Sequence, residues 1–117
     1  MTTNRSVLPA ARLDELLGAL TDDGWLLVGP RARDGAIVYD EISSAADLPA
    51  GWTDEQDAGR YRLARRDDAA LFGYVVGPHS WKKYLFPPMQ TLWSATRTAD
   101  GIAVRDERPA PRPTAFI

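Results

Sequence analysis

The sequence contains no cysteine and only one histidine, His79. Without cysteine the chain cannot form disulfides, use a thiolate nucleophile, or bind iron–sulfur clusters or zinc through sulfur. One histidine cannot build a histidine-rich metal site. No apolar run reaches the roughly 18 residues that a membrane-spanning helix needs, and the first five residues lead into no apolar signal core. We therefore expect a cytoplasmic protein that binds no membrane.

The chain also lacks an excess of charge of one sign. Its 14 basic and 16 acidic residues leave a net charge of −2, which favours neither nucleic acid nor a membrane surface as a partner. The 117 residues are 44% hydrophobic and 26% charged, as in a soluble globular domain of average size.

The clearest element is a helix predicted over residues 9–23. Leucines at 13, 16, 17 and 20 recur at the spacing of one helix face, and Gly24 can take the left-handed conformation that ends a helix. A short capped helical turn is expected over residues 43–49, and a polar loop over residues 50–59. A second short helix is expected over residues 79–86, because Pro87 and Pro88 stop it.

Three hairpins are predicted from strand-like runs and turn residues. The first joins residues 25–30 to 36–42 across an Asp-Gly turn, with Pro30 on an edge or at a bulge. The second joins residues 60–65 to 71–76 across Asp67 and Asp68. The third joins residues 90–98 to 102–107 across residues 99–101. These elements predict an α+β fold with a mainly antiparallel sheet. We expect one domain over residues 1–108, followed by a proline-rich extended tail, residues 109–117, that begins a truncated following domain.

His79 is the first candidate for catalysis, because only its side chain normally titrates near neutral pH. Ser80 follows it directly, but the chain has no Gly-x-Ser-x-Gly nucleophile motif. A Pro-His-Ser sequence is more often a turn in which the serine caps a helix. The sequence therefore favours a structural role for this pair.

Two charged clusters could bind ions, although each has a simpler interpretation. Arg60, Arg62 and Arg66 are expected on one strand face, with Arg65 beside them, where they could meet an anionic partner. A solvated sheet face is the favoured alternative, because aspartates flank the cluster. The acidic side chains of Asp54, Glu55 and Asp57 could offer oxygens to a cation, but their spacing is not that of a calcium loop. The segment is therefore expected to hold no cofactor and no metal.

A basic and aromatic element precedes the double proline and consists of Trp81, Lys82, Lys83 and Tyr84. At helical spacing Trp81, Tyr84 and Leu85 can seal a core, while the two lysines project outward. These four residues, Trp81 to Tyr84, are the candidate contact surface for a partner, and a solvated helix face is the alternative.

Four blocks of the sequence resemble the N-terminal part of the dicluster ferredoxin-type proteins: residues 33–39, 51–54, 59–63 and above all 77–88. That family is related to the iron–sulfur (beta) subunit of sulfhydrogenases and to the A subunit of anaerobic sulfite reductase. In it, a stretch like residues 112–117 leads into a cysteine-bearing segment and two motifs for [4Fe–4S] clusters.

The resemblance implies that this chain is the cysteine-free N-terminal module of an iron–sulfur electron-transfer protein. The parent protein would carry two [4Fe–4S] clusters and exchange electrons with a hydrogenase or reductase subunit. The module itself would be non-catalytic, and its partners would be the rest of the parent chain and that redox partner. The alternative is a free-standing small binding or inhibitory protein, such as an antitoxin or immunity protein. A small hydrolase that uses His79 is the least favoured class.

Overall fold

The computed structural model describes residues 5–77, 79, 81–110 and 112–117. Contacts within the chain form two compact units. The first comprises Met1–Ser80 together with Arg112–Ile117, and the second comprises Trp81–Pro111. Both helical and strand elements are present, which confirms the α+β class.

The first unit begins with the predicted helix, which is a short 3-10 turn, η1 (Ala10–Arg12), followed by α1 (Leu13–Asp22). Leu17 is fully buried, and Leu13 and Leu20 pack beside it, whereas Leu16 stays 44% exposed. Gly24 follows with a φ of +89°, which is the left-handed conformation expected after the helix.

A three-stranded sheet follows, with the strand order β2-β1-β7. Strands β1 (Leu26–Arg33) and β2 (Ala36–Glu41) form the predicted antiparallel hairpin. Asp34 and Gly35 between them have φ values of +49° and +77°. Two successive positive values are typical of a two-residue type I′ turn, the turn for which Asp-Gly is favoured.

The third strand of this sheet is β7 (Thr114–Phe116), which pairs with β1 in parallel, so the sheet is mixed. The Leu26 N–H donates to the Pro113 carbonyl at 2.8 Å, and the Ile117 N–H donates to the Val28 carbonyl at 2.9 Å. Pro30 lies beyond the last residue of β1 that β7 reaches, so its missing N–H removes no bond from this ladder. The following domain that the sequence suggested stays a prediction.

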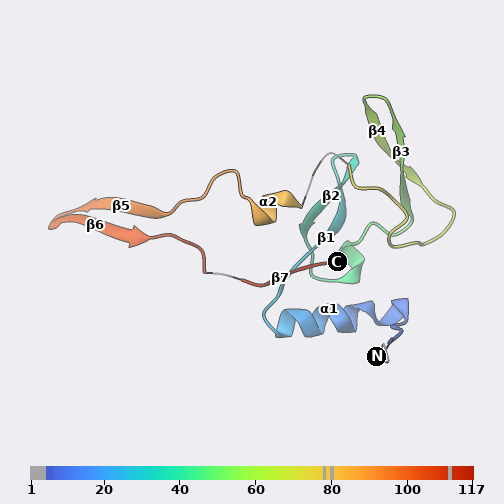
Figure 1. The fold of residues 1–117 in the computed structure, drawn as a ribbon, viewed down its shortest axis with the longest axis horizontal. Coiled ribbons are helices and arrows are strands. Elements are labelled where there is room, and N and C mark those ends of the chain that lie inside the picture. Colours follow the sequence, from blue (N-terminus) through green and yellow to red (C-terminus); the bar gives the residue numbers. More distant parts are fainter. Residues whose placement is uncertain (1–4, 78, 80, 111) are drawn as a thin grey trace. The chain divides into compact units, whose positions relative to one another are not determined.

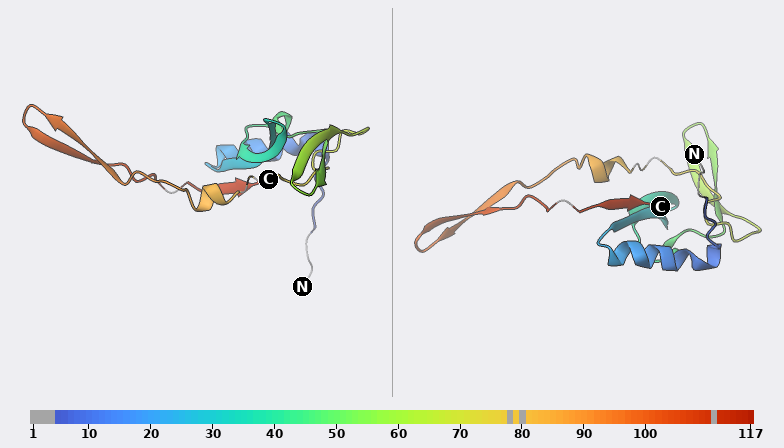
Figure 2. Two further views of the ribbon diagram at one scale, coloured as in Figure 1. Left: turned by 90° about the horizontal axis from the view of Figure 1, so that it is seen from above. Right: turned by 60° about the horizontal axis from the view of Figure 1, so that its bottom comes forward.

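Helix α1 packs on this sheet, and Figures 1 and 2 show it on one side of the strands β1, β2 and β7. The buried cluster between them consists of Leu17, Leu27, Ile42 and Leu48. Leu48 follows the 3-10 turn η2 (Ala45–Asp47), where Ser44 and Asp47 form a capping box. The Asp14 carboxylate accepts a hydrogen bond from the Ala45 N–H at 2.6 Å, which ties α1 to this turn.

The second hairpin differs from the prediction. Residues 52–57, expected in a polar loop, form β3 (Trp52–Asp57), which pairs antiparallel with β4 (Arg60–Arg65). Gly59, with a φ of +68°, makes the turn. The cross-strand pairs put opposite charges together, because Glu55 faces Arg62.

Residues 71–76, expected as the returning strand, are not a strand. Backbone N–H groups in and just after this segment donate to β3 and to β2 instead. The Val75 N–H donates to the Asp54 carboxylate, and the Gly77 N–H donates to the Ile37 carbonyl at 3.1 Å. Asp68, expected in the hairpin turn, instead binds the Arg66 guanidinium.

The second unit contains the short helix α2 (Lys82–Leu85) and the hairpin of β5 (Trp93–Thr98) and β6 (Gly101–Asp106). The third predicted hairpin is therefore confirmed, and it pairs Trp93 with Asp106 at its open end. None of the residues described in this unit is buried. Among the residues described in the two units, no helix has the length and apolar character needed to cross a bilayer.

Candidate functional site

His79 is exposed, and Ser80 lies outside the described residues. Trp81, at the start of α2, makes no side-chain capping bond. The capping role favoured for Ser80 therefore stays a prediction, and catalysis by His79 stays its disfavoured alternative.

The three candidate carboxylates, of Asp54, Glu55 and Asp57, are divided between the two faces of β3, and each binds different partners. Asp54 accepts hydrogen bonds from the Val75 N–H and, at 2.8 Å, from the Gln56 amide. Desolvation opposes ionisation of Asp54, but these bonds hold its pKa below the usual value. Glu55 pairs with Arg62, and Asp57 accepts the Ala58 N–H at 2.8 Å. Among the residues that the structure describes, no three acidic or histidine side chains are placed to share a metal ion.

The structure divides the arginine cluster instead of presenting it as one cationic face. Arg62 donates to Glu55 at 2.5 Å, and the Arg65 guanidinium lies 3.7 Å from the Trp52 ring centroid. Arg66 follows β4 and forms a two-pronged pair with Asp68 at 2.7 Å for each bond. That pair holds the pKa of Asp68 at about 2. Because opposite charges or a ring already contact three of the four arginines, the cluster is a poor site for an anion.

A corner that the sequence did not predict holds β2 to the hairpin β3–β4. The Tyr61 hydroxyl donates to the Val75 carbonyl at 2.9 Å and accepts the Ile37 N–H at 3.4 Å. Burial raises the pKa of Tyr61, although the bond from Ile37 opposes this. The Tyr74 hydroxyl is buried, with no partner among the described residues. Burial, and to a lesser degree the nearby Tyr39 and Tyr61, raise the pKa of Tyr74 well above its usual value.

An open hollow of about 480 Å³ adjoins this corner. Its lining includes Tyr61, whose hydroxyl already bonds to two backbone groups. Gly77 is also in the lining, and a Cβ at this position would lie 3.3 Å from the Tyr61 ring. The tight backbone approach and the backbone bonds indicate that this corner is structural. The alternation of Tyr61 and Leu63 along β4 placed them correctly on one face, but nothing local in the sequence shows which segment covers that face.

The predicted contact residues lie at α2, and most of them are exposed. Trp81 is 43% exposed, Lys82 and Lys83 are exposed, and Tyr84 is half-buried. The Lys83 ammonium lies 5.0 Å from the Tyr84 ring centroid. The expectation that Trp81, Tyr84 and Leu85 seal a core is wrong, because none of the three is buried and Leu85 is 50% exposed.

Sequence reasoning missed Phe86, which directly follows α2 and is 76% exposed. The signal was its position between the helical turn and two prolines that prevent the chain from continuing as a helix. We use the name α2 surface for the set Trp81, Lys82, Lys83, Tyr84, Leu85 and Phe86.

The hairpin β5–β6 has two different faces. Side chains alternate along a strand, and directly paired residues share a face. The registered pairs therefore place one group on what we call the apolar face: Trp93 with Asp106, Ala95 with Val104, and Arg97 with Ile102. The opposite, polar face carries Ser94 with Arg105, Thr96 with Ala103, and Thr98 with Gly101.

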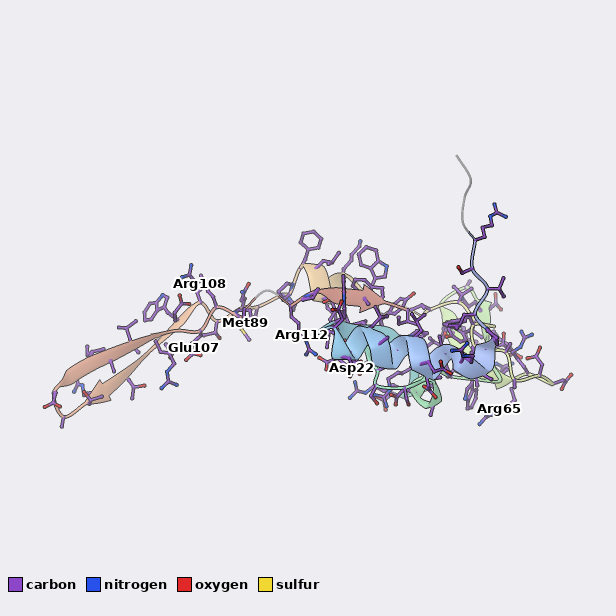
Figure 3. The ribbon with its side chains drawn as sticks, turned by 90° about the horizontal axis from the view of Figure 1, so that it is seen from below. Asp22, Arg65, Met89, Glu107, Arg108 and Arg112 are labelled. Carbon is purple, nitrogen blue, oxygen red and sulfur yellow. The ribbon has the colours of Figure 1, made fainter. Side chains whose placement is uncertain are left out.

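The apolar face is open to solvent. Trp93 is 64%, Ile102 71% and Val104 69% exposed. An open hollow of about 430 Å³ lies at the end away from the turn, lined by Leu92, Trp93, Val104, Asp106 and Arg108. Figure 3 shows Met89, Glu107 and Arg108 beside this open end of the hairpin.

No protein-family model, curated protein or solved structure gives a significant match to the chain. The resemblance to the ferredoxin-type family therefore stays a prediction.

Proposed function

We propose that this chain is a non-catalytic docking module that binds another protein through the α2 surface. The observation that carries the proposal is the exposure of large apolar side chains around two lysines, with Phe86 at 76% and Leu85 at 50%. Aromatic side chains concentrate in the centres of protein interfaces, and charged side chains at their rims. Lys82 and Lys83 would then select an acidic partner surface and speed its approach.

The partner that we propose is an iron–sulfur electron-transfer protein with two [4Fe–4S] clusters, either as the rest of a parent chain or together with its hydrogenase or reductase subunit. The resemblance of residues 77–88 to the ferredoxin-type family supports this, and α2 lies within that block. Thiolate-bound clusters would perform the redox work. Since this chain has no cysteine, it would supply packing and docking and no cluster ligand.

The first experiment is to sequence the source gene beyond the codon for Ile117. A reading frame that continues into cysteine-rich cluster motifs would supply the partner as a separate polypeptide for titration. We then expect the 117-residue chain to bind that cluster-bearing polypeptide in a calorimetric titration. Replacing Lys82→Glu together with Lys83→Glu should weaken the binding at least tenfold, because both lysines would face acidic groups.

The matched control is Arg5→Glu with Arg105→Glu, which changes the net charge equally at exposed positions outside the α2 surface. Its affinity should stay near that of the parent sequence. Equal weakening in both variants, or unchanged affinity in the lysine variant, contradicts docking through α2. A stop codon after Ile117 removes the iron–sulfur partner and favours the free-standing binding or inhibitory protein.

A further inference from the structure

We propose that the apolar face of the hairpin β5–β6 binds the same face of a second copy of this chain, with the two hairpins antiparallel. This surface is distinct from the α2 surface, and the inference does not depend on the proposed function.

The first step is that the hairpin lacks a core of its own. A two-stranded hairpin is at best marginally stable in water unless another layer covers its apolar side. No described residue of β5 or β6 is buried, and the three large apolar side chains of the apolar face are each more than 60% exposed. Covering them would remove apolar surface from water, which stabilises the hairpin.

The second step is that the two ends of the apolar face complement each other in shape. The turn end carries the exposed side chains of Arg97 and Ile102, and the open end carries the hollow of about 430 Å³. The centre holds the smaller pair, Ala95 and Val104. When two copies face each other in antiparallel orientation, the turn end of each copy meets the hollow of the other.

The third step is charge, which selects the antiparallel orientation. Arg97 lies at the turn end and Asp106 at the open end, four residues apart along the ladder, or about 13 Å. They are therefore too far apart to pair within one hairpin. In the antiparallel arrangement Arg97 lies over Trp93 of the second copy, which gives a cation–π contact.

The parallel arrangement would instead bring the two copies of Arg97 to the same end. Asp106 already accepts hydrogen bonds from Arg108, from its backbone N–H and its Nε at 3.0 Å and from its Nη2. A carboxylate offers about four acceptor positions, and Arg108 takes them, so Arg97 of the second copy contacts the Trp93 ring and not Asp106. A two-fold contact of this kind is self-complementary and closes as a dimer.

The contact is smaller than a standard interface, in which each partner buries about 800 Å². We therefore expect a reversible dimer with a dissociation constant in the micromolar range, measurable for the full 117-residue chain by sedimentation equilibrium. Val104→Arg places two like charges together at the centre of the contact and should weaken the dimer at least tenfold. Ala103→Arg introduces the same side chain one residue away, on the polar face, and should leave the dimer unchanged.

A second pair of variants keeps the test valid if Val104→Arg disturbs the hairpin. Arg97→Glu removes the cation from the Trp93 ring of the second copy and should also weaken the dimer, whereas Arg105→Glu on the polar face should not. A chain that stays monomeric at millimolar concentration, or a dimer that both faces affect equally, overturns the proposal.

Orientation can be measured directly because the chain has no cysteine of its own. A spin label on Asp100→Cys, at the turn, reports the separation of the two turns by pulsed electron resonance. The antiparallel dimer predicts a separation of about 25 Å or more, and the parallel dimer predicts about 10 Å. The shorter distance would overturn the antiparallel arrangement.

Discussion

At the scale of single residues, Tyr61 and Tyr74 of the corner differ in whether their hydroxyl groups form hydrogen bonds. Tyr61 satisfies both functions of its hydroxyl, as donor to the Val75 carbonyl and acceptor from the Ile37 N–H. On the outer edge of β2, the Ile37 N–H is bonded by the Tyr61 hydroxyl and the Ile37 carbonyl by the Gly77 N–H, so neither backbone group is left unpaired there. The Tyr74 hydroxyl is buried without a partner among the described residues, and a buried polar group in that state costs free energy.

The two Tyr→Phe substitutions should therefore differ in their effect. Tyr61→Phe leaves a backbone donor and a backbone acceptor without their partner and should lower the free energy of unfolding by about 1–2 kcal/mol. Tyr74→Phe removes a hydroxyl that bonds to none of the described residues, so it should leave the free energy of unfolding unchanged or raise it slightly. Urea denaturation of the two variants compares them directly. A larger loss in Tyr74→Phe would show that the Tyr74 hydroxyl finds a partner in solution.

At the scale of elements, the sequence predicts structure well where a local signal is sufficient. The leucine spacing predicts α1, and Asp34 with Gly35 predicts the hairpin β1–β2, because both signals lie within a few neighbouring residues. Strand β3 was missed because four of its six residues are acidic or amide side chains, which are depleted in strands. Its partner is recognisable only from the opposite charges across the ladder, such as Glu55 with Arg62.

Residues 71–76 show the opposite error, since a run rich in strand-forming residues makes no ladder. Its backbone is bonded by the Asp54 carboxylate and the Tyr61 hydroxyl. These contacts span 21 and 14 residues and leave no local signal. Similarly, residues 81–84 of the α2 surface were singled out by their basic and aromatic side chains, but the exposure of Phe86 depends on packing that the sequence pattern does not contain.

The helix α1 offers a matched test of its own packing. Leu17→Ala leaves a cavity under the sheet, because Leu17 is fully buried, and should lower the free energy of unfolding by about 2–5 kcal/mol. Leu16→Ala removes the same atoms from a side chain that is 44% exposed, and its effect should be clearly smaller. Chemical denaturation followed by far-ultraviolet circular dichroism measures both. Equal losses would mean that α1 packs on the sheet through a different face.

At the scale of the whole molecule, the two units differ in how much side-chain burial supports their hydrogen bonds. In the first unit, Leu17 of α1 is buried together with Leu27 and Ile42 against the sheet. In contrast, no described residue of β5 or β6 is buried. Amide groups exchange with solvent through local opening, which is easier where few buried contacts must be broken.

Hydrogen exchange should therefore be faster in the ladder of β5 and β6 than in that of β1 and β2. Mass spectrometry of the intact chain at low micromolar concentration, followed by peptide analysis, measures this. Raising the protein concentration should slow exchange in β5 and β6 and leave β1 and β2 unaffected, because only the hairpin gains cover from a second copy. Equal protection of both hairpins at low concentration would contradict this difference in burial.

The parallel pairing of β1 with β7 has a consequence for synthesis on the ribosome. Residues 26–28 must wait for residues 114–116 before their second edge is covered, and at usual elongation rates this takes about 5–20 s. During that interval α1 and the hairpin β1–β2 can already pack together, but Ala115 and Ile117 are missing from their core. The nascent chain thus presents an open strand edge, at which another unfinished chain could pair in place of its own last strand.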